Sequence, residues 1–112
     1  MSSNRVKQVG DNVTFPQTGA DVAVHYTLDV LADDGKRTRV DDSRARGRPL
    51  RFVLGEGTVL PWLSETVREM SLGELCVATV PPEKAYGTAG FPLLKIPPSA
   101  TLEAEIELLA IE

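Results

Sequence analysis

One cysteine and one histidine, Cys76 and His25, are the only side chains that could form a nucleophile and base pair. A cysteine enzyme activates its thiol through a neighbouring imidazole. His25 alternates with apolar residues in an extended segment, so we expect it on the face away from the core. The pattern favours a surface histidine and an inert buried thiol over a Cys–His enzyme. These two residues are also too few for an ordinary zinc site, and we expect neither a metal nor a cofactor.

Two other patterns, a glycine pair and a row of glutamates, contain residue types that could carry chemistry. Gly55-Glu56-Gly57 is similar to a piece of a phosphate loop, but no lysine followed by serine or threonine stands at the required spacing. Glu103, Glu105 and Glu107 are candidates for paired acids. Glutamates at every second position opposite an apolar face are typical of a solvated strand, however. Neither pattern indicates a catalytic site.

A basic segment spans residues 36–51. It holds seven of the 12 Lys and Arg residues of the chain: Lys36, Arg37, Arg39, Arg44, Arg46, Arg48 and Arg51. The net charge of −4, the interleaved Asp41 and Asp42 and the lack of aromatic residues in the segment disfavour a nucleic-acid partner. We expect a solvated loop with local ion pairs.

The length and composition favour one globular domain over residues 1–112, in which residues 1–9 form an N-terminal extension or the first strand. Hydrophobic residues make up 42% of the chain, too many for a disordered segment. No apolar run approaches the ~20 residues of a membrane span, and the first ten residues lack the core of a signal peptide. We expect a cytoplasmic protein that does not enter a membrane.

Hydrophobic periodicity predicts the elements that position these residues. Alternation predicts strands at residues 21–30, 50–54 and 102–110, and β-branched residues predict another at 75–80. Pro61 suits the first position of a helix in which Leu63, Val67 and Met70 share one face. About five strands and one helix predict an α+β domain with an antiparallel sheet wrapped on the helix.

A series of short segments carries a family resemblance. They are His25-Tyr26-Thr27, Asp34-Gly35-Lys36, Val40-Asp41-Asp42-Ser43-Arg44, Phe52-Val53-Leu54-Gly55, Val59-Leu60, Met70-Ser71-Leu72-Gly73-Glu74, Ala85-Tyr86-Gly87-Thr88-Ala89-Gly90, Ile96-Pro97-Pro98-Ser99-Ala100-Thr101-Leu102 and Glu107-Leu108-Leu109. In this order and spacing, from about Gly10 to Glu112, the chain resembles the FKBP family of peptidyl-prolyl isomerases. The resemblance implies a monomer with a five- to six-stranded antiparallel half-barrel around one short helix. It also implies binding of prolyl peptides, or of the macrolides tacrolimus and rapamycin.

The resemblance implies a site as well. Tyr86 would donate its hydroxyl to a substrate carbonyl, the backbone N–H of Leu60 would donate to another, and Asp41 would lie with Tyr26 and Arg46 beside the rotating amide. Tyr26, Asp41 and Tyr86 are thus the expected catalytic residues. The residues expected to line or brace the hollow are Val40, Arg46, Leu50, Phe52, Val59, Leu60, Leu63, Phe91, Ile96 and Ala104.

The sequence departs from the family where the pocket is usually aromatic. Val40, Leu50, Leu63 and Ala104 stand at such positions. Trp62 falls one residue before the usual floor tryptophan, and one helical step rotates a side chain by ~100°. We therefore expect Leu63 as the floor and Trp62 as a partly exposed aromatic, unless Pro61 shifts the helix start.

These departures leave two functions open. The first is a prolyl isomerase with reduced activity and drug affinity. The alternative is a non-catalytic FKBP-type interaction module that docks on a protein through the basic loop and the apolar tip at residues 91–95.

Overall fold

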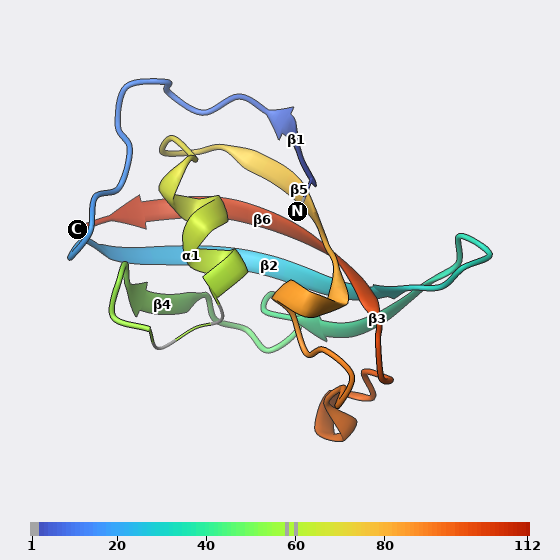
Figure 1. Ribbon diagram of the computed structural model, residues 1–112. Coiled ribbons are helices and arrows are strands. Elements are labelled where there is room, and N and C mark those ends of the chain that lie inside the picture. Colours follow the sequence, from blue (N-terminus) through green and yellow to red (C-terminus); the bar gives the residue numbers. More distant parts are fainter. Residues whose placement is uncertain (1–2, 58, 60) are drawn as a thin grey trace.

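The computed structural model of the chain describes residues 3–57, 59 and 61–112 (Figure 1). The described residues form six strands, one α-helix and two short 3-10 helices. In chain order they are β1 (Ser3–Gln8), β2 (Asp21–Leu31), β3 (Arg37–Asp42), β4 (Leu50–Val53), α1 (Pro61–Arg68), β5 (Leu75–Val80), η1 (Pro82–Lys84), η2 (Pro92–Leu94) and β6 (Thr101–Ile111). No helix among these residues is long and apolar enough to cross a membrane.

The strands form one antiparallel sheet in the order β1-β5-β6-β2-β3, with β4 also paired to β2. β2 and β6 are its long central strands, and α1 lies across them on one face (Figure 1). Alternate residues of β6 are buried against this helix, namely Leu102, Ala104, Ile106 and Leu108. The period of two therefore places one face of the strand in the core. The predicted α+β fold, a curved antiparallel sheet with one short helix, is confirmed.

The helix α1 begins at Pro61, whose fixed φ angle and missing N–H are compatible with the first helical position. It buries Trp62, Leu63, Thr66 and Val67 against the sheet. The Thr66 hydroxyl donates a 2.7 Å hydrogen bond to the carbonyl of Trp62, four residues earlier. Burial of the apolar side chains holds the first turn of the helix on the sheet, where Trp62 and Leu63 border the pocket.

Only the first part of the basic segment differs from the expected solvated loop, and the expected local ion pairs are present, such as Arg39 with Asp42 and Arg46 with Asp41. Residues 37–42 form strand β3, which pairs with β2 through the turn at Asp33-Asp34-Gly35. Gly35 has a φ angle of 87°, a value that favours glycine in such a turn. A polar, arginine-rich sequence can form this strand because β2 supplies the pairing partner. Propensity alone does not reveal that partner.

The glutamates of β6 are ion-paired and do not form a freely solvated row. Glu103 binds Arg37 at 2.7 Å, Glu105 binds Lys7 at 3.0 Å, and Glu107 pairs with Arg44. β6 lies in the middle of the sheet, so long basic side chains from neighbouring segments reach across its outer face.

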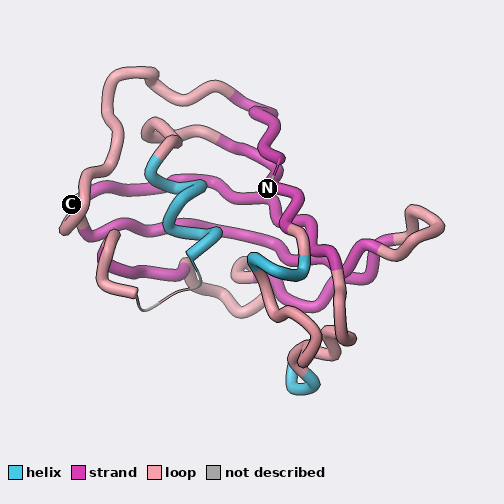
Figure 2. Tube along the Cα trace, viewed as in Figure 1, coloured by secondary structure: helices cyan, strands magenta, loops and turns pink. Residues whose placement is uncertain are grey.

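The connection between β5 and β6 contains both 3-10 helices, and η2 lies in a loop that extends away from the sheet (Figure 2). Phe91 and Ile96 form an isolated antiparallel bridge at the base of this loop. A Cβ on Gly90 would lie 2.5 Å from the carbonyl oxygen of Ile96. Only glycine allows the loop to close this tightly.

Candidate functional site

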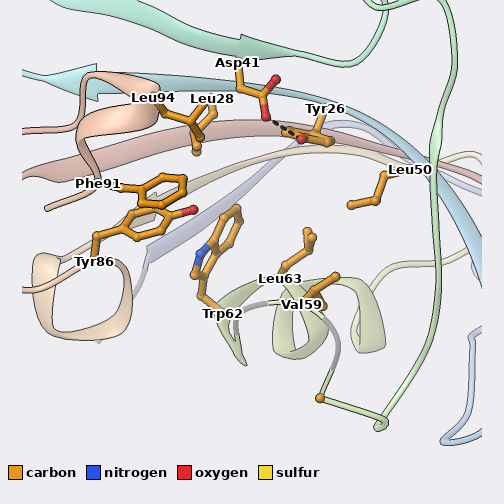
Figure 3. Close-up of a pocket in the computed structure, with 11 residues that line it drawn as sticks. Tyr26, Leu28, Asp41, Leu50, Val59, Trp62, Leu63, Tyr86, Phe91 and Leu94 are labelled. Carbon is orange, nitrogen blue, oxygen red and sulfur yellow. Dashed lines mark hydrogen bonds between the residues drawn. The ribbon is translucent and has the colours of Figure 1, made fainter.

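A pocket of about 420 Å³ opens between α1, the curved sheet and the β5–β6 connection (Figure 3). Its walls come from segments that are far apart in the sequence. The lining residues are Tyr26, Leu28, Asp41, Leu50, Gly57, Val59, Trp62, Leu63, Tyr86, Phe91 and Leu94. The lining is mainly apolar, with a few hydroxyl and carboxylate groups, as is usual for small-ligand sites.

One wall is polar and is built by β2, β3 and the loop after β3. The Tyr26 hydroxyl donates a 2.6 Å hydrogen bond to Asp41 (Figure 3). Arg46 pairs with the same carboxylate and donates a 3.1 Å hydrogen bond to the Tyr26 hydroxyl. Its guanidinium carbon also lies 5.6 Å from the centre of the Tyr26 ring. The three side chains hold one another in place, and Asp41 remains at the edge of the pocket.

A bulge in β3 orients this wall. Leu28 pairs with Asp41 and Asp29 pairs with Arg39, so Val40 is the extra residue between them. Such a bulge changes the direction in which the flanking side chains point. Asp41 lines the main pocket, whereas Val40 lines a neighbouring hollow of about 340 Å³. Of the two expected roles, lining or bracing the pocket, Val40 does not take the first: it packs against the core beside the pocket.

Both phenols of the site stay protonated at neutral pH. Burial raises the pKa of Tyr26, and its hydrogen bond to Asp41 raises that pKa further. Burial also raises the pKa of Tyr86, with a smaller contribution from the negative charge of Asp41. Tyr86 is thus available as a neutral hydrogen-bond donor.

The wall opposite Asp41 is aromatic. The rings of Tyr86 and Phe91 stack with their centres 5.2 Å apart and their planes 5° from parallel. Figure 3 shows the Tyr86 hydroxyl directed into the pocket, toward the Trp62 side. Leu94 of η2 extends this wall. The β5–β6 connection therefore presents both a flat apolar surface and a hydroxyl group.

The floor contains both Trp62 and Leu63. Their exposed fractions are 5% and 6%, and both side chains line the pocket. The expectation of a partly exposed Trp62 is wrong. A buried helix face is at least ~100° wide, and two successive residues fit within it when the helix begins directly over the cavity.

The other expected residues divide between the pocket and its surroundings. Leu50 and Val59 line the pocket. Phe52, Ile96 and Ala104 are buried in the core around it and are not lining residues, and Arg46 contacts Asp41 and Tyr26 from outside the lining. Leu60 lies outside the residues that the structure describes.

Four lining residues were absent from the expected set: Leu28, Gly57, Trp62 and Leu94. A sequence signal existed for Leu28, because it lies two residues after Tyr26 and strand alternation places both on one face. Leu94 and Gly57 lie in the loop and 3-10 regions, which have no such period.

The histidine and the cysteine are not part of this site. His25 Nδ1 lies 2.8 Å from the Ser43 hydroxyl, and Cys76 is buried in the core. Burial raises the pKa of the Cys76 thiol to about 11, so it is not a thiolate at neutral pH. Within the described residues, no group of three or more His, Cys, Asp and Glu side chains is placed to hold a metal ion.

Comparison with known proteins shows the family of the chain. Residues 12–109 match the family model described as FKBP-type peptidyl-prolyl cis-trans isomerase. The chain is 41% identical over 103 residues to peptidyl-prolyl cis-trans isomerase Fkbp12 of Drosophila melanogaster and to peptidyl-prolyl cis-trans isomerase FKBP1A of Xenopus laevis. Each alignment covers 92% of this chain and 91% of the relative.

A solved structure shows the same fold. The crystal structure of FkpA from Escherichia coli superposes with a TM-score of 0.79 and 34% sequence identity, over 99% of this chain. This chain spans about half of FkpA, since 48% of that chain is covered. With a family match over most of its length, the chain belongs to the FKBP-type peptidyl-prolyl cis-trans isomerases.

Proposed function

We propose that the pocket between α1 and the sheet binds an X-Pro segment and accelerates rotation about its amide bond. The observation that supports this most directly is the arrangement of two polar groups across an apolar cavity: Asp41, held by Tyr26 and Arg46, faces the wall that carries the Tyr86 hydroxyl. Such a cavity can hold a prolyl ring and contact the carbonyl groups beside it.

The reaction requires no covalent step. Rotation about an amide bond is slow because resonance is lost in the twisted state, at a cost of about 18–20 kcal/mol. A pocket with little water favours the less delocalised twisted amide over the planar one, and this differential binding lowers the barrier. In this mechanism Tyr86 holds a carbonyl of the segment by donating its hydroxyl hydrogen. Asp41 lies beside the rotating group.

We expect the activity to be lower than in members with a more aromatic pocket. Leu50 and Leu63 provide less apolar area than the rings usual at these positions, while Val40 and Ala104 contribute nothing to the lining. Less apolar contact means weaker binding of the twisted state. Trp62 restores part of the lost area from its adjacent position on the floor.

The same pocket is proposed to bind macrolides of the tacrolimus and rapamycin type. Its volume of about 420 Å³ falls within the range of small-molecule pockets, roughly 300–1,000 Å³. The reduced aromatic lining predicts a lower affinity than that of a fully aromatic pocket.

An isomerisation assay on a short X-Pro peptide, with and without tacrolimus, tests the proposal. We expect a measurable rate that tacrolimus inhibits and that Asp41→Asn lowers. Asp34→Asn is a matched control, because it makes the same chemical change at an exposed turn outside the pocket. A folded protein that gives only the uncatalysed rate at high concentration would refute the proposal.

A second function, docking on a protein client, is favoured by the loop at residues 91–95. Leu93 in this loop is 86% exposed, whereas the apolar residues of the core are at most 9% exposed. The neighbouring hollow beside Val40 adds apolar surface. For this function, Leu93→Ser weakens binding to a protein client and leaves the isomerisation rate of a short peptide unchanged. If the wild type and Leu93→Ser bind the client with equal affinity, the loop is not the contact.

A further inference from the structure

The indole nitrogen of Trp62 has no hydrogen-bond partner in the part of the chain that the structure describes. Among the residues that the structure describes, Nε1 of Trp62 is the only buried side-chain nitrogen or oxygen in this condition. The side chain is 5% exposed, so bulk water does not satisfy the N–H either. A buried donor without a partner costs roughly 1–3 kcal/mol, and native proteins retain such groups rarely. This donor therefore calls for an acceptor that the described residues of the free chain do not supply.

The position of the indole suggests where that acceptor lies. Trp62 lines the main pocket and also a smaller hollow of about 220 Å³ between α1 and η1. Figure 3 shows the nitrogen edge of the ring on the side of the pocket that carries Tyr86. No hydrogen bond joins the Tyr86 hydroxyl to another described residue, and that hydroxyl also points into the cavity. Two unused donors thus face the same part of the pocket.

The smaller hollow is less suited to supply the acceptor. Its carboxylates are Glu65 and Glu83, and the Glu65 carboxylate lies 3.6 Å from the Lys84 ammonium. Glu83 is exposed to solvent. An acceptor oxygen on a ligand in the main pocket is neither paired with a lysine, as Glu65 is, nor exposed to solvent, as Glu83 is.

We propose that the Trp62 indole N–H donates a hydrogen bond to a backbone carbonyl oxygen of the bound prolyl segment, on the Tyr86 side of the pocket. This inference rests on the proposed function. An indole N–H only donates, and a carbonyl oxygen has two lone pairs, so one oxygen can accept from both Trp62 and Tyr86. A ligand without a carbonyl at this place leaves the donor unpaired and binds less well, which makes Trp62 a specificity-determining residue.

Trp62 is the only tryptophan of the chain, so its indole proton gives a single NMR signal in the ¹⁵N-labelled protein. We expect saturation with a short X-Pro peptide to move this proton signal downfield and to slow its exchange with water. The same titration records backbone signals of the pocket, which report binding independently.

The kinetic test replaces the indole nitrogen with sulfur, by incorporating the benzothiophene analogue of tryptophan at position 62. This change keeps the ring but removes the donor. We expect KM to rise about three- to tenfold with kcat unchanged, because the carbonyl is bound equally in the planar and twisted states. Trp62→Phe is a genetically encoded counterpart, and a thermal melt of each protein checks that it is folded.

A KM equal to that of the unmodified protein overturns the inference, whatever the NMR signal does. Failure of the proposed function looks different. In that case the unmodified protein neither binds nor isomerises the peptide, and both proposals fall together. If the unmodified protein is active and only the analogue is indistinguishable from it, the inference about Trp62 alone fails.

Discussion

The hydroxyl of Tyr26 lies 2.6 Å from the carboxylate of Asp41, and Arg46 contacts both groups. The three residues come from β2, β3 and the loop that follows β3. Because each one limits the rotation of the other two, the carboxylate keeps a fixed position at the edge of the pocket. A fixed polar wall is what a site needs if it is to bind a twisted amide better than a planar one.

Tyr26→Phe tests this wall. We expect the free energy of unfolding to fall by about 1–2 kcal/mol, because Asp41 loses a partly buried hydrogen bond to a charged acceptor. We also expect kcat/KM for an X-Pro peptide to fall severalfold as the carboxylate gains freedom. Urea unfolding and the isomerisation assay measure the two effects. Wild-type values in both would show that Arg46 alone positions Asp41.

Tyr86→Phe tests the opposite wall. The variant keeps the ring that stacks on Phe91 and loses only the hydroxyl. We expect tacrolimus binding to weaken by about 0.5–1.5 kcal/mol, the usual net contribution of one hydrogen bond. Isothermal titration gives the dissociation constant. An unchanged value would mean that this hydroxyl does not contact the ligand.

Trp62→Leu tests the floor. Because Trp62 is buried and lines the pocket, we expect weaker tacrolimus binding and a loss of about 1–3 kcal/mol in the free energy of unfolding. Binding that stays at the wild-type value in the folded variant would show that Leu63 alone forms the floor.

Leu63→Trp is the companion variant. An added indole offers several tens of Å² of apolar contact, at roughly 25 cal/mol per Å². Leu63 is already buried beside Trp62, however, and overpacking costs about 1–3 kcal/mol. We expect a lower melting temperature and no gain in affinity. Tighter binding at an unchanged melting temperature would show that the floor has unfilled space.

Alkaline pH tests the buried thiol. The folded protein raises the pKa of Cys76 from 9.0 to about 11, so between these values the unfolded chain has lost a proton that the native state retains. The stability from the buried neutral thiol is therefore complete below pH 9 and disappears as the pH rises to about 11. Burial also raises the pKa values of Tyr26 and Tyr86, which adds a loss of the same sign at higher pH.

Urea unfolding of the wild type and Cys76→Ala from pH 7 to 11 measures this effect. We expect the variant to be less stable at every pH, because removal of the buried sulfur leaves a cavity. Its stability should fall less steeply above pH 9. Parallel curves would show that the thiol has the same pKa in both states.

The sequence alone determined the strands β2, β4, β5 and β6, the helix α1 and several residues of the pocket walls, whereas β3 was expected to be a loop. Alternating residues marked β2 and β6, and Pro61 marked the start of α1, because one buried face imposes a period on a strand or a helix. The motifs around Tyr26, Asp41 and Tyr86 indicated the walls of the pocket. These signals are local, and they can be read without knowing which segments meet.

Only the tertiary structure decided which side chains reach the cavity. The bulge at Val40 depends on how β3 pairs with β2, and the inclusion of Trp62 depends on where the first turn of α1 lies over the sheet. The pairing of Glu103 with Arg37 likewise depends on a contact between residues 66 positions apart. Register and the placement of one element on another are set by packing between distant segments, and a periodic pattern in one segment contains no information about its partner.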